Sequence, residues 1–173
     1  MNSPYMGRFY ISQGFTLGTH DGLDLVGRDS KEIHATVSGT VHYAGWENPN
    51  DHSQGFGQYV CIKAGSRYYY YGHLSELRVK TGQTVKCTDV IGIEGSTGKS
   101  TGSHCHYEIR TEFRKNSPTN VVDVCGVSGI PNVKGGTYDD GYRPGTSAPA
   151  KSTKQVTLII DDHTYSGLLS EQL

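Results

Sequence analysis

The stretch Gly98-Lys-Ser-Thr-Gly-Ser-His-Cys-His-Tyr-Glu-Ile-Arg110 decides the fold of this chain. Its centre is a His-x-His pair, His104 and His106, between a loop rich in Gly, Ser and Thr and a strand-like run. Successive side chains of a β-strand point to opposite faces, so residues two apart share one face, with Cα atoms about 6.5–7 Å apart. The pair therefore predicts two imidazoles side by side, close enough for one to bind a metal while the other reaches a water on it. Alone, the pair leaves a second interpretation open: two unrelated histidines on the polar face of a strand. Cys105 points to the other face.

Length and composition limit the class of protein. The 173 residues can build one good core, and a formal net charge of −1 gives no long-range attraction to nucleic acid or to an anionic membrane. The 23 glycines and 12 tyrosines predict a protein rich in strands and turns. No apolar run reaches the roughly 20 residues that span a bilayer, so we expect no membrane insertion. Residues 1–10 contain no apolar core of a signal peptide.

Alternating apolar residues predict short strands along most of the chain. Residues 33–44 predict two strands around a turn or bulge at Ser38-Gly39, and the tyrosines of 68–71 put aromatic rings on both faces of another strand. Residues 47–57 are expected as a polar loop along the edge of a groove. No long helix is expected, only one turn at residues 75–77. Further strands are expected at residues 58–64, 67–73, 84–86 and 90–94.

The composition of the chain changes after Val127. We expect a folded domain at residues 1–128, a linker rich in Gly, Pro, Ser and Thr at 129–155, and a short segment at 156–173. The last segment predicts a small hairpin and then the start of a helix from Ser166. It is too short to fold alone, so we expect the start of another module or an oligomerisation arm.

Several other residues of types that bind metals have no partner at ligand spacing. His34, His42 and His52 are expected on the surface. The cysteines are widely spaced, without a Cys-x-x-Cys pair, so we expect buried thiols, with one or two disulfides as the alternative. They are Cys61, Cys87, Cys105 and Cys125.

A second candidate for chemistry is His20-x-x-x-Asp24, within Thr19-His-Asp-Gly-Leu-Asp-Leu-Val26. Gly22 in the middle argues against a helix, so a loop that enters a strand fits better. The motif alone leaves two interpretations open: a pair of metal ligands, or a buried histidine and aspartate that only hydrogen-bond to each other.

Together, three motifs resemble the M23 family of zinc metallopeptidases, the lysostaphin-like peptidoglycan endopeptidases. The similarity runs from about Phe15 to Arg110. It implies an all-β fold: a two-sheet antiparallel sandwich with long loops around a groove. The motifs are His20-x-x-x-Asp24, His73 within Tyr71-Gly-His-Leu74, and the His-x-His pair within Thr101-Gly-Ser-His-Cys-His-Tyr-Glu108.

The resemblance also implies a site. Carried over residue by residue, the zinc ligands are His20, Asp24 and His106, and the histidines beside the metal that do not bind it are His73 and His104. The chain departs from the family at four positions, which puts the fit of substrate in doubt rather than activity. Ser103 replaces the usual Pro, Cys105 replaces Leu, Tyr107 replaces Phe, and Cys87 stands where Gly is common.

The chemistry of this residue set agrees with zinc. Two neutral imidazoles and one carboxylate leave Zn²⁺ with an open fourth position, as in catalytic zinc sites. The motif His-Glu-x-x-His is absent, so a histidine has to take the proton of the attacking water. We expect His104 in that role and His73 as a hydrogen bond to the oxyanion, with the exchange of the two roles left open. Glu108 either orients a ligand histidine or makes a surface salt bridge.

We therefore expect a zinc-dependent endopeptidase that cleaves a peptide bond in the stem or cross-bridge of bacterial peptidoglycan. It would act on the cell wall, outside the cytoplasm, or be delivered by a phage as a lysin with its catalytic domain first. Two other functions stay open. An inactive relative would serve as a binding or activator module and would bind no stoichiometric zinc, and a phosphoryl-carrier domain would use two histidines without a metal.

Overall fold

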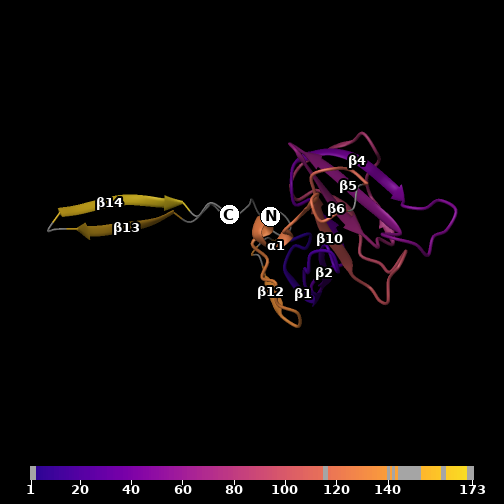
Figure 1. Cartoon of the computed structure of the whole chain (residues 1–173), viewed down its shortest axis with the longest axis horizontal. Coiled ribbons are helices and arrows are strands. Elements are labelled where there is room, and N and C mark those ends of the chain that lie inside the picture. Colours follow the sequence, from indigo (N-terminus) through magenta and orange to yellow (C-terminus); the bar gives the residue numbers. More distant parts are fainter. Residues whose placement is uncertain are drawn as a thin grey trace.

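The computed structural model describes residues 3–114, 117–139, 141, 143, 153–160 and 163–170, the last two segments by their backbone alone. Its regular elements are β-strands with one short helix (Figure 1), and the strands pair antiparallel. Within these segments, no helix has the length and apolar character needed to cross a membrane.

One large sheet contains most of the strands. The strand that carries the His-x-His pair, β10, lies between β2 and β6 in the middle of this sheet, and all its residues are buried. The order in space is β12 (Thr137–Asp139), β1 (Arg8–Gln13), β2 (Leu23–Gly27), β10 (Cys105–Arg110), β6 (Arg67–Gly72), β5 (Gln58–Ala64), β4 (Gly39–Trp46) and β8 (Thr84–Val85), with β11 (Val121–Val122) paired to β10.

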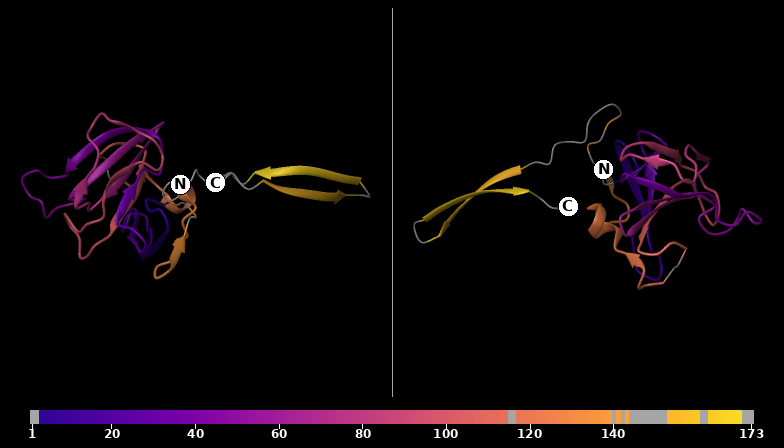
Figure 2. Two further views of the ribbon diagram at one scale, coloured as in Figure 1. Left: turned by 180° about the vertical axis from the view of Figure 1, so that it is seen from behind. Right: turned by 90° about the horizontal axis from the view of Figure 1, so that it is seen from above.

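A smaller sheet packs against the large one. It consists of β3 (Glu32–His34), β9 (Val90–Ile93) and β7 (Glu76–Leu77). Apolar side chains from both sheets meet in one core, where Ile33 and Ile91 of the small sheet join Leu25, Ile62 and Ile109 of the large one. Burial of each such side chain contributes roughly 1.5–3 kcal/mol. The expected antiparallel sandwich of two sheets is therefore confirmed (Figure 2).

The other face of the large sheet carries a second cluster, which is aromatic. On β6, Tyr69 and Tyr71 point into the main core, whereas Tyr70 joins Tyr59 and the thiol of Cys61 on the opposite face. This follows from the alternation of side chains along a strand. The prediction that this run of tyrosines presents rings to both faces is confirmed.

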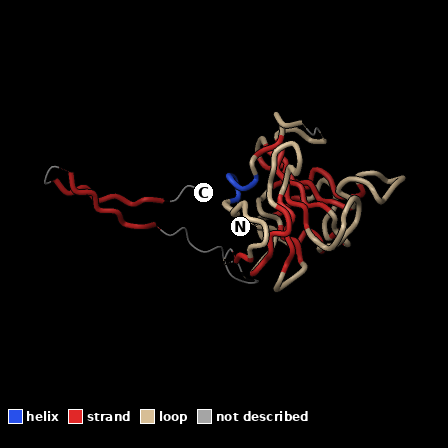
Figure 3. Tube along the Cα trace, turned by 60° about the horizontal axis from the view of Figure 1, so that its bottom comes forward, coloured by secondary structure: helices blue, strands red, loops and turns tan. Residues whose placement is uncertain are grey.

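Two short elements differ from the sequence-based expectation. The helical turn expected at residues 75–77 is wrong, because this segment forms strand β7 against β9. The helix α1 (Val124–Ser128) has no predicted counterpart and is shown in blue in Figure 3. Its first N–H groups are capped by the side chain of Asp123, and it ends at Gly129, whose φ of 74° suits a residue without a Cβ.

The folded unit extends past the predicted boundary at residue 128. Ile130 is only 4 % exposed within the main core, and β12 pairs with β1 at the edge of the large sheet. Residues 129–139, the start of the expected linker, are therefore part of the folded unit, because main-chain pairing at a sheet edge does not depend on an apolar composition. Residues 140, 142 and 144–152 of that linker lie outside the described residues.

The C-terminal segment contains the hairpin that the sequence predicts. Its strands are β13 (Thr153–Ile160) and β14 (His163–Ser170), which pair with each other along their whole length. The helix expected from Ser166 is wrong, since Ser166 to Ser170 continue the second strand of the hairpin.

The remaining histidines and cysteines follow the predictions in part. His42 and His52 are exposed, as expected, but His34 is only 3 % exposed and its Nδ1 lies 2.8 Å from the carbonyl oxygen of Thr88. The prediction that His34 lies on the surface is wrong, because β3 covers the core and its last two residues are buried. All four cysteines are thiols: Cys61 and Cys105 are buried, and Cys87 and Cys125 are half-buried.

Candidate metal centre

The pairing of two strands creates the candidate metal centre. Asp24 on β2 and His106 on β10 are direct cross-strand partners. Side chains of such partners lie on the same face with Cβ atoms about 4.5–5.5 Å apart. His20 reaches the same point from the loop before β2. Residues 82 positions apart in the sequence thus become neighbours.

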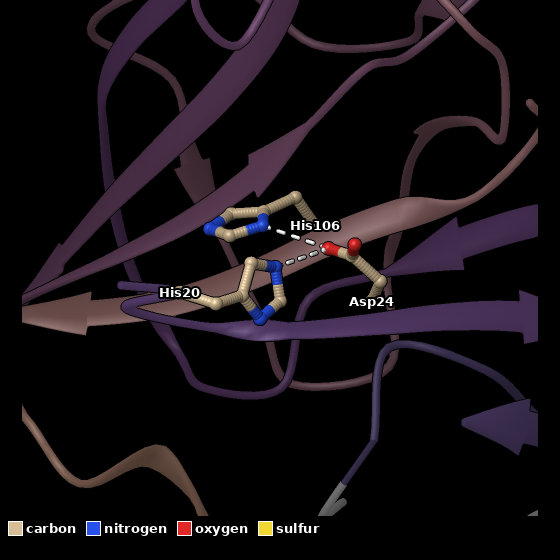
Figure 4. Close-up of side chains that lie close together, drawn as sticks. All are labelled: His20, Asp24 and His106. Atoms are coloured by element: carbon tan, nitrogen blue, oxygen red, sulfur yellow. Dashed lines mark hydrogen bonds and ion pairs between the residues drawn. The ribbon is translucent and has the colours of Figure 1, made fainter. Parts of the chain in front are cut away.

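Three potential ligand atoms converge on one point (Figure 4). His106 Nδ1 lies 2.8 Å and His20 Nε2 lies 3.0 Å from the same oxygen, Asp24 Oδ1. These ligand atoms all lie within 4.8 Å of one another. The structure therefore brings together all three residues that the resemblance implied as zinc ligands.

The second nitrogen of each of these imidazoles has its own hydrogen-bond partner. His20 Nδ1 lies 2.8 Å from the carbonyl oxygen of Gly14, and His106 Nε2 lies 3.1 Å from Glu108 Oε2. An imidazole that donates one N–H to an oxygen presents the lone pair of its other nitrogen to a metal. Both rings are thus held in the tautomer that metal binding requires.

Hydrogen bonds within the cluster shift the pKa values of its members. Burial alone would raise the pKa of the Asp24 carboxyl, but hydrogen bonds from His106 and His20 outweigh it and hold that pKa well below its ordinary value. Burial would lower the pKa of His106, yet the carboxylates of Asp24 and Glu108 raise it to about 9. A divalent cation would take the place of the protons in this cluster. Two imidazole nitrogens and one carboxylate oxygen fit Zn²⁺.

The other two predicted histidines lie next to this cluster. His104 Nε2 is 3.5 Å from Asp24 Oδ1, and the ring centroids of His104 and His73 are 4.6 Å apart. Each ring has its Nδ1 at 2.7 Å from a carbonyl oxygen, that of Gly102 for His104 and that of Thr97 for His73. In a neutral ring held through Nδ1–H in this way, Nε2 carries the lone pair. Burial lowers the pKa of His73 to about 4.

His73 also has an unusual backbone. Its φ of 63° lies in the left-handed region, which costs a residue with a side chain of order 1 kcal/mol or more and which occurs often at functional sites. The main chain holds it there, because His73 N–H donates to the carbonyl of Phe56 at 2.7 Å. The ring is directed toward His104 and His106 as a result.

An open groove of about 890 Å³ contains the cluster. Its lining includes the aromatic side chains of Phe56, Tyr59 and Tyr70 and parts of the loops 47–57 and 95–102. These loops touch at Gly57 and Gly98, where a Cβ on either glycine would overlap the main chain of the other loop. The prediction that the loop at 47–57 lines the groove is confirmed.

Of the two alternatives for Glu108, orientation of a candidate ligand histidine agrees with the structure, and the surface salt bridge is wrong, because the ion pair that Glu108 makes with Arg110 is buried. Its carboxylate is 2 % exposed and accepts hydrogen bonds from His106 Nε2 and from Arg110 Nε. The guanidinium of Arg110 in turn lies over the ring of Tyr70, 4.8 Å from its centroid. Glu108 is thus a buried ion-pair partner that also orients a candidate ligand.

We expect Glu108→Gln to weaken zinc binding about 10- to 100-fold. The amide keeps the shape but loses the charge that holds the N–H of His106 and pairs with Arg110. Competition with a chromophoric chelator at fixed pH measures the affinity. Glu76→Gln is the control, because it removes a carboxylate paired with an arginine at the surface. Equal affinities for the two variants would contradict the role of Glu108.

Comparisons with known proteins agree with this geometry. The family model of peptidase family M23 matches residues 18–121. Lysostaphin of Staphylococcus simulans is 31% identical over 142 residues, which cover 81% of this chain and 26% of that protein. Glycyl-glycine endopeptidase ALE-1 of Staphylococcus capitis is 33% identical over 106 residues, which cover 60% of this chain and 28% of that protein. The chain spans about a quarter of the length of these relatives.

Solved structures share the fold. The catalytic domain of lysostaphin from Staphylococcus simulans matches with a TM-score of 0.56 at 28% identity, over 70% of this chain and 91% of that chain. A zinc-containing peptidase from Vibrio cholerae matches with a TM-score of 0.57 at 26% identity, over 71% of this chain and 38% of that chain. With these likenesses and a family match over more than half its length, the chain belongs to peptidase family M23.

Proposed function

We propose that this peptidase is a zinc-dependent endopeptidase that hydrolyses a peptide bond in the stem or cross-bridge of bacterial peptidoglycan. The observation that carries the proposal is the convergence of His20, Asp24 and His106 within an open groove. The names of lysostaphin and of glycyl-glycine endopeptidase ALE-1 support a peptide substrate of this kind. Because that substrate lies outside the cytoplasmic membrane, we propose the cell wall as the place of action.

The three ligands and the groove have separate tasks. His20 Nε2, His106 Nδ1 and Asp24 Oδ1 would hold the ion. Zinc bound there supplies a Lewis acid that polarises the scissile carbonyl and makes a water more acidic. The floor and walls of the groove hold an extended peptide across this point, so that its carbonyl carbon faces the attacking water.

We assign the proton transfer to His104. Its Nδ1–H donates to the carbonyl of Gly102, so the lone pair of Nε2 can accept a proton from water as the oxygen attacks the carbonyl carbon. When the C–N bond breaks, the same nitrogen returns that proton to the leaving amine. His73 is neutral before the reaction, because burial lowers its pKa to about 4; the negative charge of the developing oxyanion would raise that pKa, so that the ring takes a proton from solvent and donates from Nε2 to the oxyanion. The alternative exchanges the two roles, because both rings are held through Nδ1.

Mass spectrometry of the fragments released from purified cell walls of several peptidoglycan chemotypes tests the proposal. We expect new amino and carboxyl termini within the stem or cross-bridge peptides, their loss after treatment with a chelator, and their return when zinc is added. A protein that holds no stoichiometric zinc and releases no fragments from any chemotype would instead favour a binding or activator module. A metal-free protein that accepts phosphate from a donor protein would favour a phosphoryl carrier.

A further inference from the structure

The loop that leads to His104 has a flexible composition, so contacts with the rest of the fold have to hold it in one conformation. Residues 95–102 are rich in Gly, Ser and Thr, and a Cβ built on Gly102 would meet no atom within 4 Å. Such a segment loses much conformational entropy when it becomes ordered. His104 at its end nevertheless has to keep one ring orientation toward the metal centre.

Glu94 lies in the chain between β9 and this loop, and its carboxylate contacts Ser103, the residue that follows the loop. Its side chain is fully buried and accepts four hydrogen bonds. The donors are Tyr5 Oη at 2.6 Å, the main-chain N–H of Gly27 at 2.8 Å, Lys31 Nζ at 2.7 Å and Ser103 Oγ at 2.6 Å. Burial alone would raise the pKa of Glu94, but these bonds outweigh it, so that the pKa lies below its ordinary value and the group is a carboxylate at neutral pH.

The hydrogen bond between Ser103 and Glu94 also orients the ring of His104, because the peptide groups before and after Ser103 both take part in hydrogen bonds of His104. On one side, the carbonyl of Gly102 accepts the hydrogen bond from His104 Nδ1 at 2.7 Å. On the other side, the N–H of His104 donates to the carbonyl of Gly95 at 3.0 Å. A Ser103 held on Glu94 fixes both peptide groups, which leaves Nε2 of the ring directed at Asp24.

We propose that Glu94, through the hydroxyl of Ser103, is a positioning residue for His104. The inference rests on the proposed function, because it takes His104 as the group that accepts the proton. Tyr5 belongs to the same network and precedes the part of the chain that the family model matches, residues 18–121. The N-terminal segment is therefore part of the unit that holds the active site in shape.

Ser103→Ala tests the proposal, since it removes only the hydroxyl. We expect kcat to fall about tenfold, with KM within about twofold and bound zinc unchanged. NMR should show faster hydrogen exchange of the His104 amide. Ser103→Thr keeps a hydroxyl and should restore kcat to within about twofold. Ser96→Ala, the control, removes a hydroxyl of the same loop that bonds to Ser100 at 2.9 Å and not to Glu94, and should leave both measurements unchanged.

The following results would contradict the proposal that Glu94 positions His104. Unchanged exchange at the His104 amide in Ser103→Ala overturns it, and so does unchanged kcat. A rise in KM alone would assign Ser103 to substrate binding instead.

Glu94→Gln keeps the size of the side chain and should reproduce the loss of kcat. If the wild-type protein cleaves no cell-wall peptide, the proposed function fails, while the exchange comparison still decides whether Glu94 holds His104 in place.

Discussion

Asp24→Asn should lose stoichiometric zinc and lower hydrolysis by a factor on the order of 10³ or more. Asparagine has the shape of aspartate, so the fold can persist, but its amide carries no charge. Asp24 Oδ1 is the atom to which His20 Nε2 and His106 Nδ1 both point, at 3.0 and 2.8 Å. Without the carboxylate, two neutral imidazoles remain, and a catalytic zinc site ordinarily has three protein ligands.

Elemental analysis after dialysis measures the zinc, and release of peptide from one cell-wall substrate measures the rate. Asp29→Asn is a matched control, because it neutralises a carboxylate that also has a close cationic partner, Arg8 at 2.7 Å, outside the cluster of candidate ligands. It should keep both zinc and activity. One zinc per chain at a near wild-type rate in Asp24→Asn would contradict its assignment as a ligand.

The local part of the site could be predicted from the sequence. Strand alternation correctly separates Cys105, which is buried in the core, from His104 and His106, which flank it and face the cluster. The pairing of His106 with Asp24 could not be derived in this way. It spans 82 residues and depends on the packing of the whole sheet, so only the resemblance to a family indicated it.

The carbonyl groups that orient the histidines could not be predicted at all. The oxygens of Gly14, Thr97 and Gly102 each lie at 2.7–2.8 Å from an imidazole nitrogen, but every residue has a carbonyl, so no residue type marks them. The end of the folded unit was missed for a related reason. The segment after residue 128 has the composition of a linker, while its contribution to the fold consists largely of one apolar side chain, Ile130, and of main-chain pairing.

His104→Ala should lower kcat by about 10²- to 10⁴-fold while zinc stays bound, because its ring is outside the group of candidate ligands and is the proton acceptor in the mechanism that we propose. His73→Ala should lower it by about 10²- to 10³-fold, the effect of one lost oxyanion contact. The two ranges overlap, so rates alone do not separate the roles. Imidazole added to the buffer should restore part of the activity of His104→Ala, since a small base can enter the open groove, and should not restore that of His73→Ala.

The rescue pattern therefore assigns the base. The rings of His73 and His104 are both held through Nδ1 on a carbonyl oxygen, so either could act as the general base. They differ in burial and in the 3.5 Å distance from His104 Nε2 to Asp24 Oδ1. Rescue of His73→Ala alone would exchange the roles. His42→Ala, which removes an exposed histidine beside Tyr68, should keep the wild-type rate. Near wild-type hydrolysis by zinc-loaded His104→Ala would refute the mechanism, because the proton of the attacking water would then have another acceptor.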